Sequence, residues 1–157
     1  MNENDIRPSA SRPYRCIADC VLADGGFQER MENVVEHLWN VLRNTGVSWV
    51  GFYVPEGDQL VLGPRRDKPA CSPIGMHGAC GQCFTKAEAV IVHDVADLGE
   101  NYIACDPRDK SEVVVPMIDP IGRCRGVLDL DSHEVGAFTE DDAAGLTMIL
   151  RAAGLTR

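Results

Sequence analysis

The stretch Val47-Ser-Trp-Val-Gly-Phe-Tyr-Val54 predicts a β-strand with two different faces. Successive side chains of a strand point to opposite sides of the sheet. The even-numbered residues from 50 to 54 are valine or phenylalanine, which suits a hydrophobic core. On the other side Gly51 separates Trp49 from Tyr53, and this face suits the floor of a pocket, with space between two aromatic walls. Packing of both rings under a helix is the alternative.

The sequence on either side of this strand predicts an α+β fold. Apolar residues recur at i, i+3, i+4 and i+7 from Phe27 to Arg43, as in an amphipathic helix. A capping-box pattern from Thr139 to Asp142 opens a final helix. The further strands that we expect lie at 59–63, 89–92, 111–118 and 123–132. This order predicts an antiparallel sheet of five to six strands, with N- and C-terminal helices packed on one face and loops over a ligand pocket on the other.

Composition and charge describe an ordinary globular protein. The 157 residues fit one domain, and we expect a flexible N-terminal arm at 1–15 followed by a single domain at 16–157. A net charge of −9 argues against nucleic acid and against an anionic membrane as partners. No apolar run has the length of a transmembrane helix, and Met1 to Pro13 lacks the apolar core of a signal peptide. These features predict a cytoplasmic protein.

Seven cysteines, an odd number, argue against a structural disulfide framework in such a protein. Cys16 and Cys20 lie four residues apart among apolar neighbours, and we expect them to pack. Cys80 precedes a short helix expected at 81–88, where the helix dipole favours a thiolate. Cys80 and Cys83 form a C-x-x-C pattern, so a zinc site completed by Cys16 and Cys20 is an alternative to simple packing of Cys83.

The region from Asn101 to Pro116 contains the strongest candidate for a reactive thiol. It places Cys105 in a polar loop that leads into an apolar strand, and Glu112 lies at the start of that strand. Loops tolerate exposure while a strand fixes position, although a small packing cysteine is the alternative. A second long loop, at 63–79, carries Cys71, and loops of this length are usually functional or mobile.

Two further carboxylates lie on the last predicted strand. Asp129 and Asp131 alternate along it and therefore project the same way, about 6.6 Å apart. A solvated sheet face is the alternative, but the apolar runs 113–115 and 127–130 indicate central strands covered on both sides. Nearby negative charge raises the pKa of a thiol. A thiol among acids therefore fits a substrate with a positive group, or an oxygen that a protonated acid hydrogen-bonds.

Seven short motifs, in order and with similar spacing, closely resemble the free methionine-(R)-sulfoxide reductases, which are single-domain GAF proteins. They are Trp49-Val-Gly-Phe-Tyr53, Leu62-Gly-Pro, Lys68-Pro-Ala-Cys71, Gly78-Ala-Cys-Gly81, Ile103-Ala-Cys-Asp106, Ser111-Glu-Val-Val-Val-Pro116 and Gly126-Val-Leu-Asp-Leu-Asp-Ser132. The resemblance runs from about Trp49 to the end of the chain. It departs from the family in the interval between Cys71 and Cys80, which is a residue shorter and atypical in sequence. Cys83 and Cys124 are additional thiols, and Cys124 is either a strand filler or an alternative redox partner.

The resemblance implies a thiol-based oxidoreductase. Cys105 would attack the sulfur of free methionine sulfoxide, release methionine and become a sulfenic acid. Cys71 would resolve it as a disulfide, with Cys80 as a second or relay thiol. A sulfenic acid must be captured before it oxidises further, which favours a resolving thiol on a mobile loop. No cofactor is implied, because thioredoxin would restore the dithiol, and GAF proteins favour a homodimer.

The resemblance also assigns the substrate-binding residues. Glu112, Asp129 and Asp131 would bind the ammonium group and the sulfoxide oxygen, with one of the three as proton donor. Trp49 and Tyr53 would enclose the S-methyl group. A buried acid cluster tends to keep one proton, which agrees with the need for an acid. The alternative function is a GAF sensory module that binds a small ligand or senses oxidant without turnover.

Overall fold

The structure is a computed structural model that describes residues 12–102 and 105–157. Its strands are β1 (Trp49–Glu56), β2 (Gln59–Arg66), β3 (Val90–Val92), β4 (Ser111–Ile118) and β5 (Cys124–Ser132). Its helices are α1 (Tyr14–Ala18), α2 (Phe27–Leu42), α3 (Ala79–Lys86) and α4 (Glu140–Ala152), with a 3-10 segment, η3 (Val95–Asn101). The strands form one antiparallel five-stranded sheet in the order β2-β1-β5-β4-β3.

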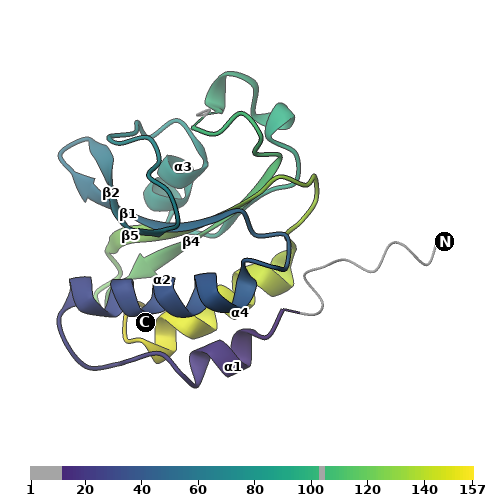
Figure 1. Cartoon of the computed structure of the whole chain (residues 1–157). Helices are drawn as coiled ribbons and strands as arrows, with labels where there is room; N and C mark the ends of the chain where they lie inside the picture. Colours follow the sequence, from purple (N-terminus) through teal and green to yellow (C-terminus); the bar gives the residue numbers. More distant parts are fainter. Residues whose placement is uncertain (1–11, 103–104) are drawn as a thin grey trace.

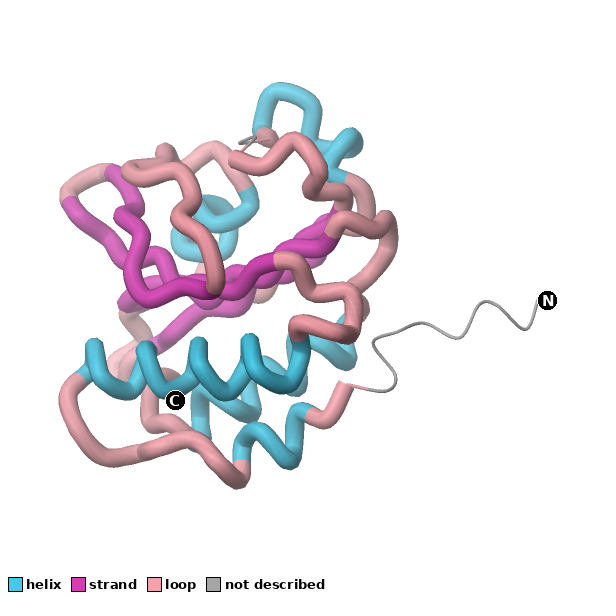
Figure 2. Tube along the Cα trace, viewed as in Figure 1, coloured by secondary structure: helices cyan, strands magenta, loops and turns pink. Residues whose placement is uncertain are grey.

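The sheet has helices on one face and loops on the other, as the sequence predicts. Helices α1, α2 and α4 lie together on one side, whereas α3 and the long loops lie on the opposite side (Figure 1, Figure 2). The predicted alternation in β1 is confirmed, because Val50 and Phe52 are in the core on the helix side while Trp49 and Tyr53 are in a second apolar cluster under α3.

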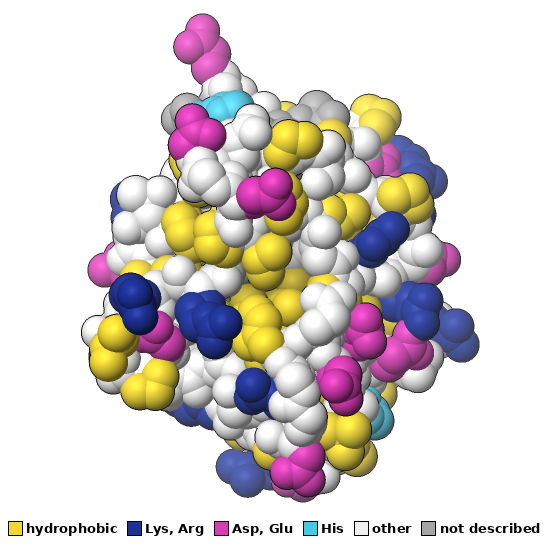
Figure 3. All heavy atoms as spheres, turned by 90° about the vertical axis from the view of Figure 1, so that its left-hand side faces the viewer, with side chains coloured by type: hydrophobic (Ala, Val, Ile, Leu, Met, Phe, Trp, Pro, Cys, Tyr) yellow, Lys and Arg dark blue, Asp and Glu magenta, His cyan; other side chains and the backbone are white. Residues whose placement is uncertain are grey.

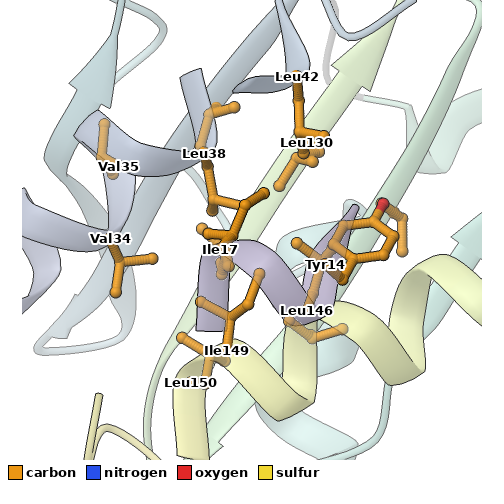
Figure 4. Packing of buried hydrophobic residues seen from close by; sticks show 14 of the residues in the cluster. Tyr14, Ile17, Val34, Val35, Leu38, Leu42, Leu130, Leu146, Ile149 and Leu150 are labelled. Carbon is orange, nitrogen blue, oxygen red and sulfur yellow. The ribbon is translucent and has the colours of Figure 1, made fainter. Parts of the chain in front are cut away.

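The larger core lies between the sheet and the three helices. Side chains from α1, α2, α4 and β5 converge there, among them Ile17, Leu38, Leu130 and Leu146 (Figure 4). Leu38, Leu130 and Leu146 are fully buried. Helix α4 begins with the predicted capping box, in which the Thr139 backbone N–H donates to Asp142 Oδ2 at 2.8 Å.

Several element boundaries differ from the predicted ones, among them those of β2 and α3. Strand β2 continues to Arg66, beyond the predicted end at residue 63, because it stays paired with β1 through Val50 and Gly51. Helix α3 begins at Ala79, earlier than predicted, and ends before Ala87, which adopts the left-handed conformation with φ of 54°. A left-handed residue at this position is a common way to terminate a helix.

The predicted N-terminal arm is too long at its inner end. Arg12 and Tyr14 are buried, and Arg12 Nη1 donates to Asp142 Oδ1 at 2.8 Å and to the Ala137 carbonyl at 2.8 Å. The Tyr14 hydroxyl also donates to Asp142. A buried carboxylate at the start of α4 therefore draws residues from 12 onward into the fold. The rest of the predicted arm, 1–11, lies outside the described residues.

Cys16 and Cys20 are exposed, so the prediction that they pack is wrong. Helix α1 packs through Tyr14 and Ile17, which lie three residues apart, and this spacing turns the two thiols toward solvent. Because α1 lies on the opposite side of the sheet from Cys80, the zinc site of four cysteines is also contradicted (Figure 1).

The surface shows no dominant acidic field on the face in Figure 3, where acidic and basic side chains are interspersed around a central group of hydrophobic ones. The large exposed hydrophobic side chains of the described residues are Leu22, Val41, Ile121 and Val135. Within residues 12–102 and 105–157, no helix has the length and apolar character that a membrane span requires.

Candidate active site

A pocket lies on the face of the sheet that α3 and η3 cover. Its innermost part, the inner cavity, encloses about 40 Å³ above β1, β4 and β5. A wider hollow of about 270 Å³, the outer hollow, adjoins it and opens between the loops at 68–70 and 105–109. The two share Trp49, Ala70, Cys105, Asp109 and Asp131 in their walls. Cys105 therefore lies where the inner cavity meets the outer hollow.

Strand register brings the three predicted carboxylates together. Glu112 of β4 pairs directly with Asp131 of β5, and Asp131 pairs with Trp49 on its other side. Asp129 lies opposite Gly51. All three carboxylates line the inner cavity, and Asp129 is only 4% exposed. The acid cluster, Glu112, Asp129 and Asp131, is thus a pocket wall and not a solvated sheet face.

Burial and mutual repulsion raise the pKa of each member of the acid cluster well above its usual range. Burial is the largest cause for all three, followed by the charge of a neighbouring carboxylate. Hydrogen bonds link Glu112, Asp129 and Asp131 to one another, and Asp129 also bonds to Cys80. The cluster therefore favours the protonated form more than exposed carboxyl groups do, and it can supply a proton to a bound group.

One oxygen of this cluster has no hydrogen-bond partner. Asp129 Oδ1 is buried and unpaired among the described residues. A buried polar atom without a partner is costly, and in a native structure it commonly marks a place where another group binds. Because Asp129 lines the inner cavity, the missing partner would come from a molecule or ion within that cavity.

Two of the three thiols that the sequence analysis assigned to the reaction are joined. Cys71 and Cys105 form a disulfide, with Cα atoms 5.5 Å apart. Cys105 is exposed and Cys71 is half-buried, so the disulfide is open to solvent from the side of the outer hollow. The structure thus brings together two residues that are 34 positions apart in sequence.

The aromatic residues of β1 bind the loop that carries Cys71. The Tyr53 hydroxyl donates to the Cys71 carbonyl at 2.9 Å, and Trp49 Nε1 donates to the Lys68 carbonyl at 2.8 Å. The indole of Trp49 also lies across Gly51, where a Cβ would collide with it. The space that the sequence suggested above Gly51 is therefore filled by Trp49, which both forms a wall and holds the loop.

Cys80 lies in the first turn of α3 and faces the acid cluster. It is buried, and burial raises its pKa well above the usual value, with a further increase from the charges of Asp129 and Glu112. The prediction that the helix N-terminus favours its thiolate is wrong, because burial among acids outweighs the dipole. Cys83 is fully buried and packs as predicted, and Cys124 is half-buried with its thiol donating to the Gly126 carbonyl at 3.3 Å.

Sequence reasoning missed a charged rim at the outer hollow, formed by Lys68, Asp106 and Arg108, with His133 beside Asp106. Asp106 Oδ2 accepts from Lys68 Nζ at 2.5 Å and from Arg108 Nη2 at 3.0 Å, and His133 Nε2 lies 3.5 Å away. The hydrogen bonds from Arg108 and Lys68 hold the Asp106 pKa well below its usual range. The residues of the rim come from separate loops. The one signal in the sequence was that Asp106 and Arg108 follow closely after Cys105.

Asp109 is a second residue that sequence reasoning missed. It lines both the inner cavity and the outer hollow. Burial, followed by the charge of Asp106, raises its pKa to about 6. Its place between Cys105 and Glu112 in the sequence is the signal that could have found it, since both flanking residues were candidates.

The sequence and the fold have known relatives. The GAF domain family matches residues 26–156. The free methionine-R-sulfoxide reductase of Escherichia coli strain K12 is 32% identical over 152 residues, covering 96% of this chain and 87% of the relative. GAF domain-containing protein A of Dictyostelium discoideum is 39% identical, covering 85% of this chain and 96% of the relative.

A solved structure of a free methionine-R-sulfoxide reductase is also similar to this chain. Free methionine-R-sulfoxide reductase from Neisseria meningitidis, in complex with its substrate, has a TM-score of 0.77 at 34% identity, over 92% of this chain and 87% of that one. The chain therefore belongs to the GAF domain family and is related to the free methionine-(R)-sulfoxide reductases.

Proposed function

We propose that this protein reduces free methionine-(R)-sulfoxide to methionine, with Cys105 as the nucleophile. The observation that carries the proposal is the Cys71–Cys105 disulfide at the junction between the inner cavity and the outer hollow. A thiol pair beside protonated carboxyl groups provides the electrons and the acid that sulfoxide reduction needs. The relatives with this activity support the choice of substrate.

The chemistry uses two electrons from two thiols. The Cys105 thiolate attacks the sulfoxide sulfur while an acid protonates the oxygen, and transfer of that oxygen leaves a sulfenic acid on Cys105 and releases methionine. The Cys71 thiol then attacks the sulfenic acid, which forms the disulfide and releases water. Thioredoxin reduces the disulfide by thiol–disulfide exchange, and the exposure of Cys105 gives it access.

The acid cluster supplies both recognition and protons. Burial and mutual repulsion raise the pKa values of Glu112, Asp129 and Asp131, so one of them is available as the acid for the sulfoxide oxygen. An ionised neighbour binds the substrate's ammonium group, which a peptide-bound methionine lacks. In this proposal Trp49 and Tyr53 enclose the S-methyl group, since both line the inner cavity.

Cys80 is the second thiol in this proposal. Its raised pKa makes it a poor nucleophile while it stays buried. It can act as a relay only if α3 or the Cys71 loop moves during the cycle. Disulfide mapping after a single turnover without reductant distinguishes the two resolving thiols, because Cys71 gives the bond seen here and Cys80 gives a different one.

The experiment that tests the function couples turnover to thioredoxin and NADPH. We expect NADPH oxidation with free methionine-(R)-sulfoxide, and none with the S epimer or with peptide-bound sulfoxide. Cys105→Ser should abolish turnover, whereas Cys124→Ser is the matched control because that thiol lies outside the pocket walls. Equal rates on peptides would contradict the specificity, and full activity of Cys105→Ser would contradict the mechanism. Binding of the sulfoxide without any product would instead favour the sensory module.

A further inference from the structure

The inner cavity contains three potential metal ligands that come from three different elements. Cys80 Sγ and one carboxylate oxygen each from Glu112 and Asp129 lie within 4.8 Å of one another. Cys80 is fixed by α3, Glu112 by β4 and Asp129 by β5. Because the sheet register and the helix hold the three groups in place, they are partly arranged for a ligand before it binds.

Asp129 provides an independent sign that a cation binds here. Its side chain is 4% exposed, and its Oδ1 has no hydrogen-bond partner among the described residues. The described residues that line the inner cavity include four carboxylates and no lysine, arginine or histidine. A cation that enters the cavity would satisfy the unpaired oxygen and supply the missing counter-charge together, whereas a neutral donor would satisfy only the oxygen.

The ligand types indicate which cation fits. A thiolate with two carboxylates suits a borderline-soft divalent ion such as zinc(II), whereas calcium and magnesium prefer oxygen ligands alone. With Zn–S and Zn–O bonds of about 2.3 Å and 2.0 Å, tetrahedral ligands lie roughly 3.3 to 3.5 Å apart. The cluster needs only a small contraction from its present limit of 4.8 Å.

We propose that Cys80, Glu112 and Asp129 bind a thiophilic divalent cation, of the class of zinc(II), and that the bound ion and the substrate exclude one another. Binding requires the Cys80 thiol to release its proton to the solvent. The exclusion rests on the proposed function, because it assumes that the substrate's ammonium group occupies the same acids. The binding of the metal itself does not depend on that function.

A second group of potential ligands is less suitable. Asp106, Asp109 and His133 also have ligand atoms within 4.8 Å of one another. Asp106 is already paired with Lys68 and Arg108, whose positive charges repel a metal ion. This group offers no sulfur, so a thiolate signal from a bound metal distinguishes the two sites.

Cobalt(II) added to the oxidised protein tests the site directly. With the Cys71–Cys105 disulfide intact, we expect a thiolate-to-cobalt absorption band that saturates at a single equivalent and disappears when zinc(II) is added. Cys80→Ser should remove the band, and Asp129→Asn should weaken binding by roughly tenfold or more. Glu112→Gln is the conservative variant for the third ligand. Circular dichroism of each variant checks that the fold is retained.

Matched controls separate this site from the other thiols and from the second group. Cys83→Ala and the double variant Cys16→Ser/Cys20→Ser should keep the band, and so should Asp109→Asn. A wild-type protein without the band would overturn the site. A band lost in Cys83→Ala or in Cys16→Ser/Cys20→Ser, but retained in Cys80→Ser, would overturn it as well.

The exclusion is tested on the variant Cys71→Ser/Cys105→Ser, which keeps Cys80 but can neither turn over nor form the disulfide. Methionine sulfoxide should raise the apparent dissociation constant for cobalt(II) in proportion to its concentration. Simultaneous binding of both ligands would overturn the exclusion. If this variant bound cobalt(II) but no methionine sulfoxide, the proposed function would be contradicted and the exclusion with it, while the metal site would stand.

Discussion

At the scale of single residues, Tyr53 has two connections to the proposed chemistry. Its ring lines the inner cavity, and its hydroxyl holds the backbone of Cys71. A resolving thiol must reach the sulfenic acid before further oxidation, so any group that positions it affects the outcome of each turnover. The hydroxyl can be removed without loss of the ring, which makes its contribution measurable.

We predict that Tyr53→Phe slows formation of the Cys71–Cys105 disulfide by roughly twofold to tenfold, because it removes a hydrogen bond with a net value of about 0.5 to 1.5 kcal/mol. After one turnover without reductant, dimedone labelling and mass spectrometry should find more sulfenic acid on Cys105. Tyr102→Phe is the control, since its hydroxyl makes only a 3.5 Å contact to the Asp106 carbonyl. Equal labelling of the two variants would contradict this role.

Asp109 gives a pH-dependent effect on stability. Its pKa rises from 3.8 to about 6 in the folded protein, so the folded state binds the proton more tightly than the unfolded state does. Stability from this group is fully present below about pH 4 and is lost as pH rises through 6. Asp109→Asn should therefore gain stability relative to the wild type between pH 4 and pH 7.

The expected gain is about 1 kcal/mol after allowance for solvent screening. Urea unfolding of both proteins at pH 4 and pH 7 measures it, as the change with pH of the difference in stability between the two proteins. Asp97→Asn, at an exposed position, is the control. A difference between wild type and Asp109→Asn that did not change with pH would contradict the assignment.

At the scale of elements, the loop between β2 and α3 forms one side of the outer hollow. It carries Cys71, is held by Trp49 and Tyr53, and forms an isolated bridge to β2 through Leu60 and Ile74. The loop is therefore attached at several points in the disulfide form, although the sequence suggested mobility. The Cys71–Cys105 disulfide is a further attachment, and its reduction frees the loop at that point.

We predict that the oxidised protein does not bind methionine sulfoxide. Its inner cavity of about 40 Å³ holds only a few water molecules. The substrate can therefore bind only after the Cys71–Cys105 disulfide has been reduced. Isothermal titration should detect binding to Cys71→Ser/Cys105→Ser but not to oxidised wild type, with Cys16→Ser/Cys20→Ser in the oxidised form as the control. Equal affinity for the two forms would show that the disulfide does not close the cavity.

The strands show clearly what the sequence can predict. The alternation of side-chain types along β1 and β5 was enough to predict which face of each strand lies in the core and which lines the pocket. Side chains of a strand point to opposite faces of the sheet with a period of two residues. The meeting of Glu112 with Asp131 could also be expected once both strands were placed. The charged rim could not, because its members come from loops whose approach depends on tertiary packing.

Cys80 illustrates a different difficulty. A helix N-terminus lowers a thiol pKa, and that rule can be applied to the sequence alone. Burial beside Asp129 acts in the opposite direction and is stronger here, but it depends on how closely α3 lies on the sheet. Local rules fail where a three-dimensional contact opposes them.

At the scale of the whole molecule, the sheet separates stability from chemistry. The helix side contains the larger core and the buried Arg12–Asp142 pair, while the pocket lies on the other side. Mutations on the helix side should therefore change the free energy of unfolding without changing the pocket. A homodimer stays a prediction, which light scattering of the purified protein can test.

We predict that Asp142→Ala lowers the free energy of unfolding by about 3 to 5 kcal/mol, because it leaves Arg12 as an unpaired buried charge. Asp141→Ala, at the exposed neighbouring position, should cost less than about 1 kcal/mol. Guanidinium unfolding followed by circular dichroism compares the two. At a temperature where both variants are folded, the KM for methionine sulfoxide should be unchanged, and equal destabilisation of both would contradict the importance of the pair.

The contact between Arg12 and Asp142 joins residues 130 positions apart, near the two ends of the chain. It also governs where the protein can be shortened. A version that began at residue 16, the boundary expected from the sequence, would lose Arg12 and Tyr14 together and expose the start of α4. Truncations and N-terminal fusions should therefore preserve everything from residue 12 onward, and an affinity tag is better attached ahead of that point.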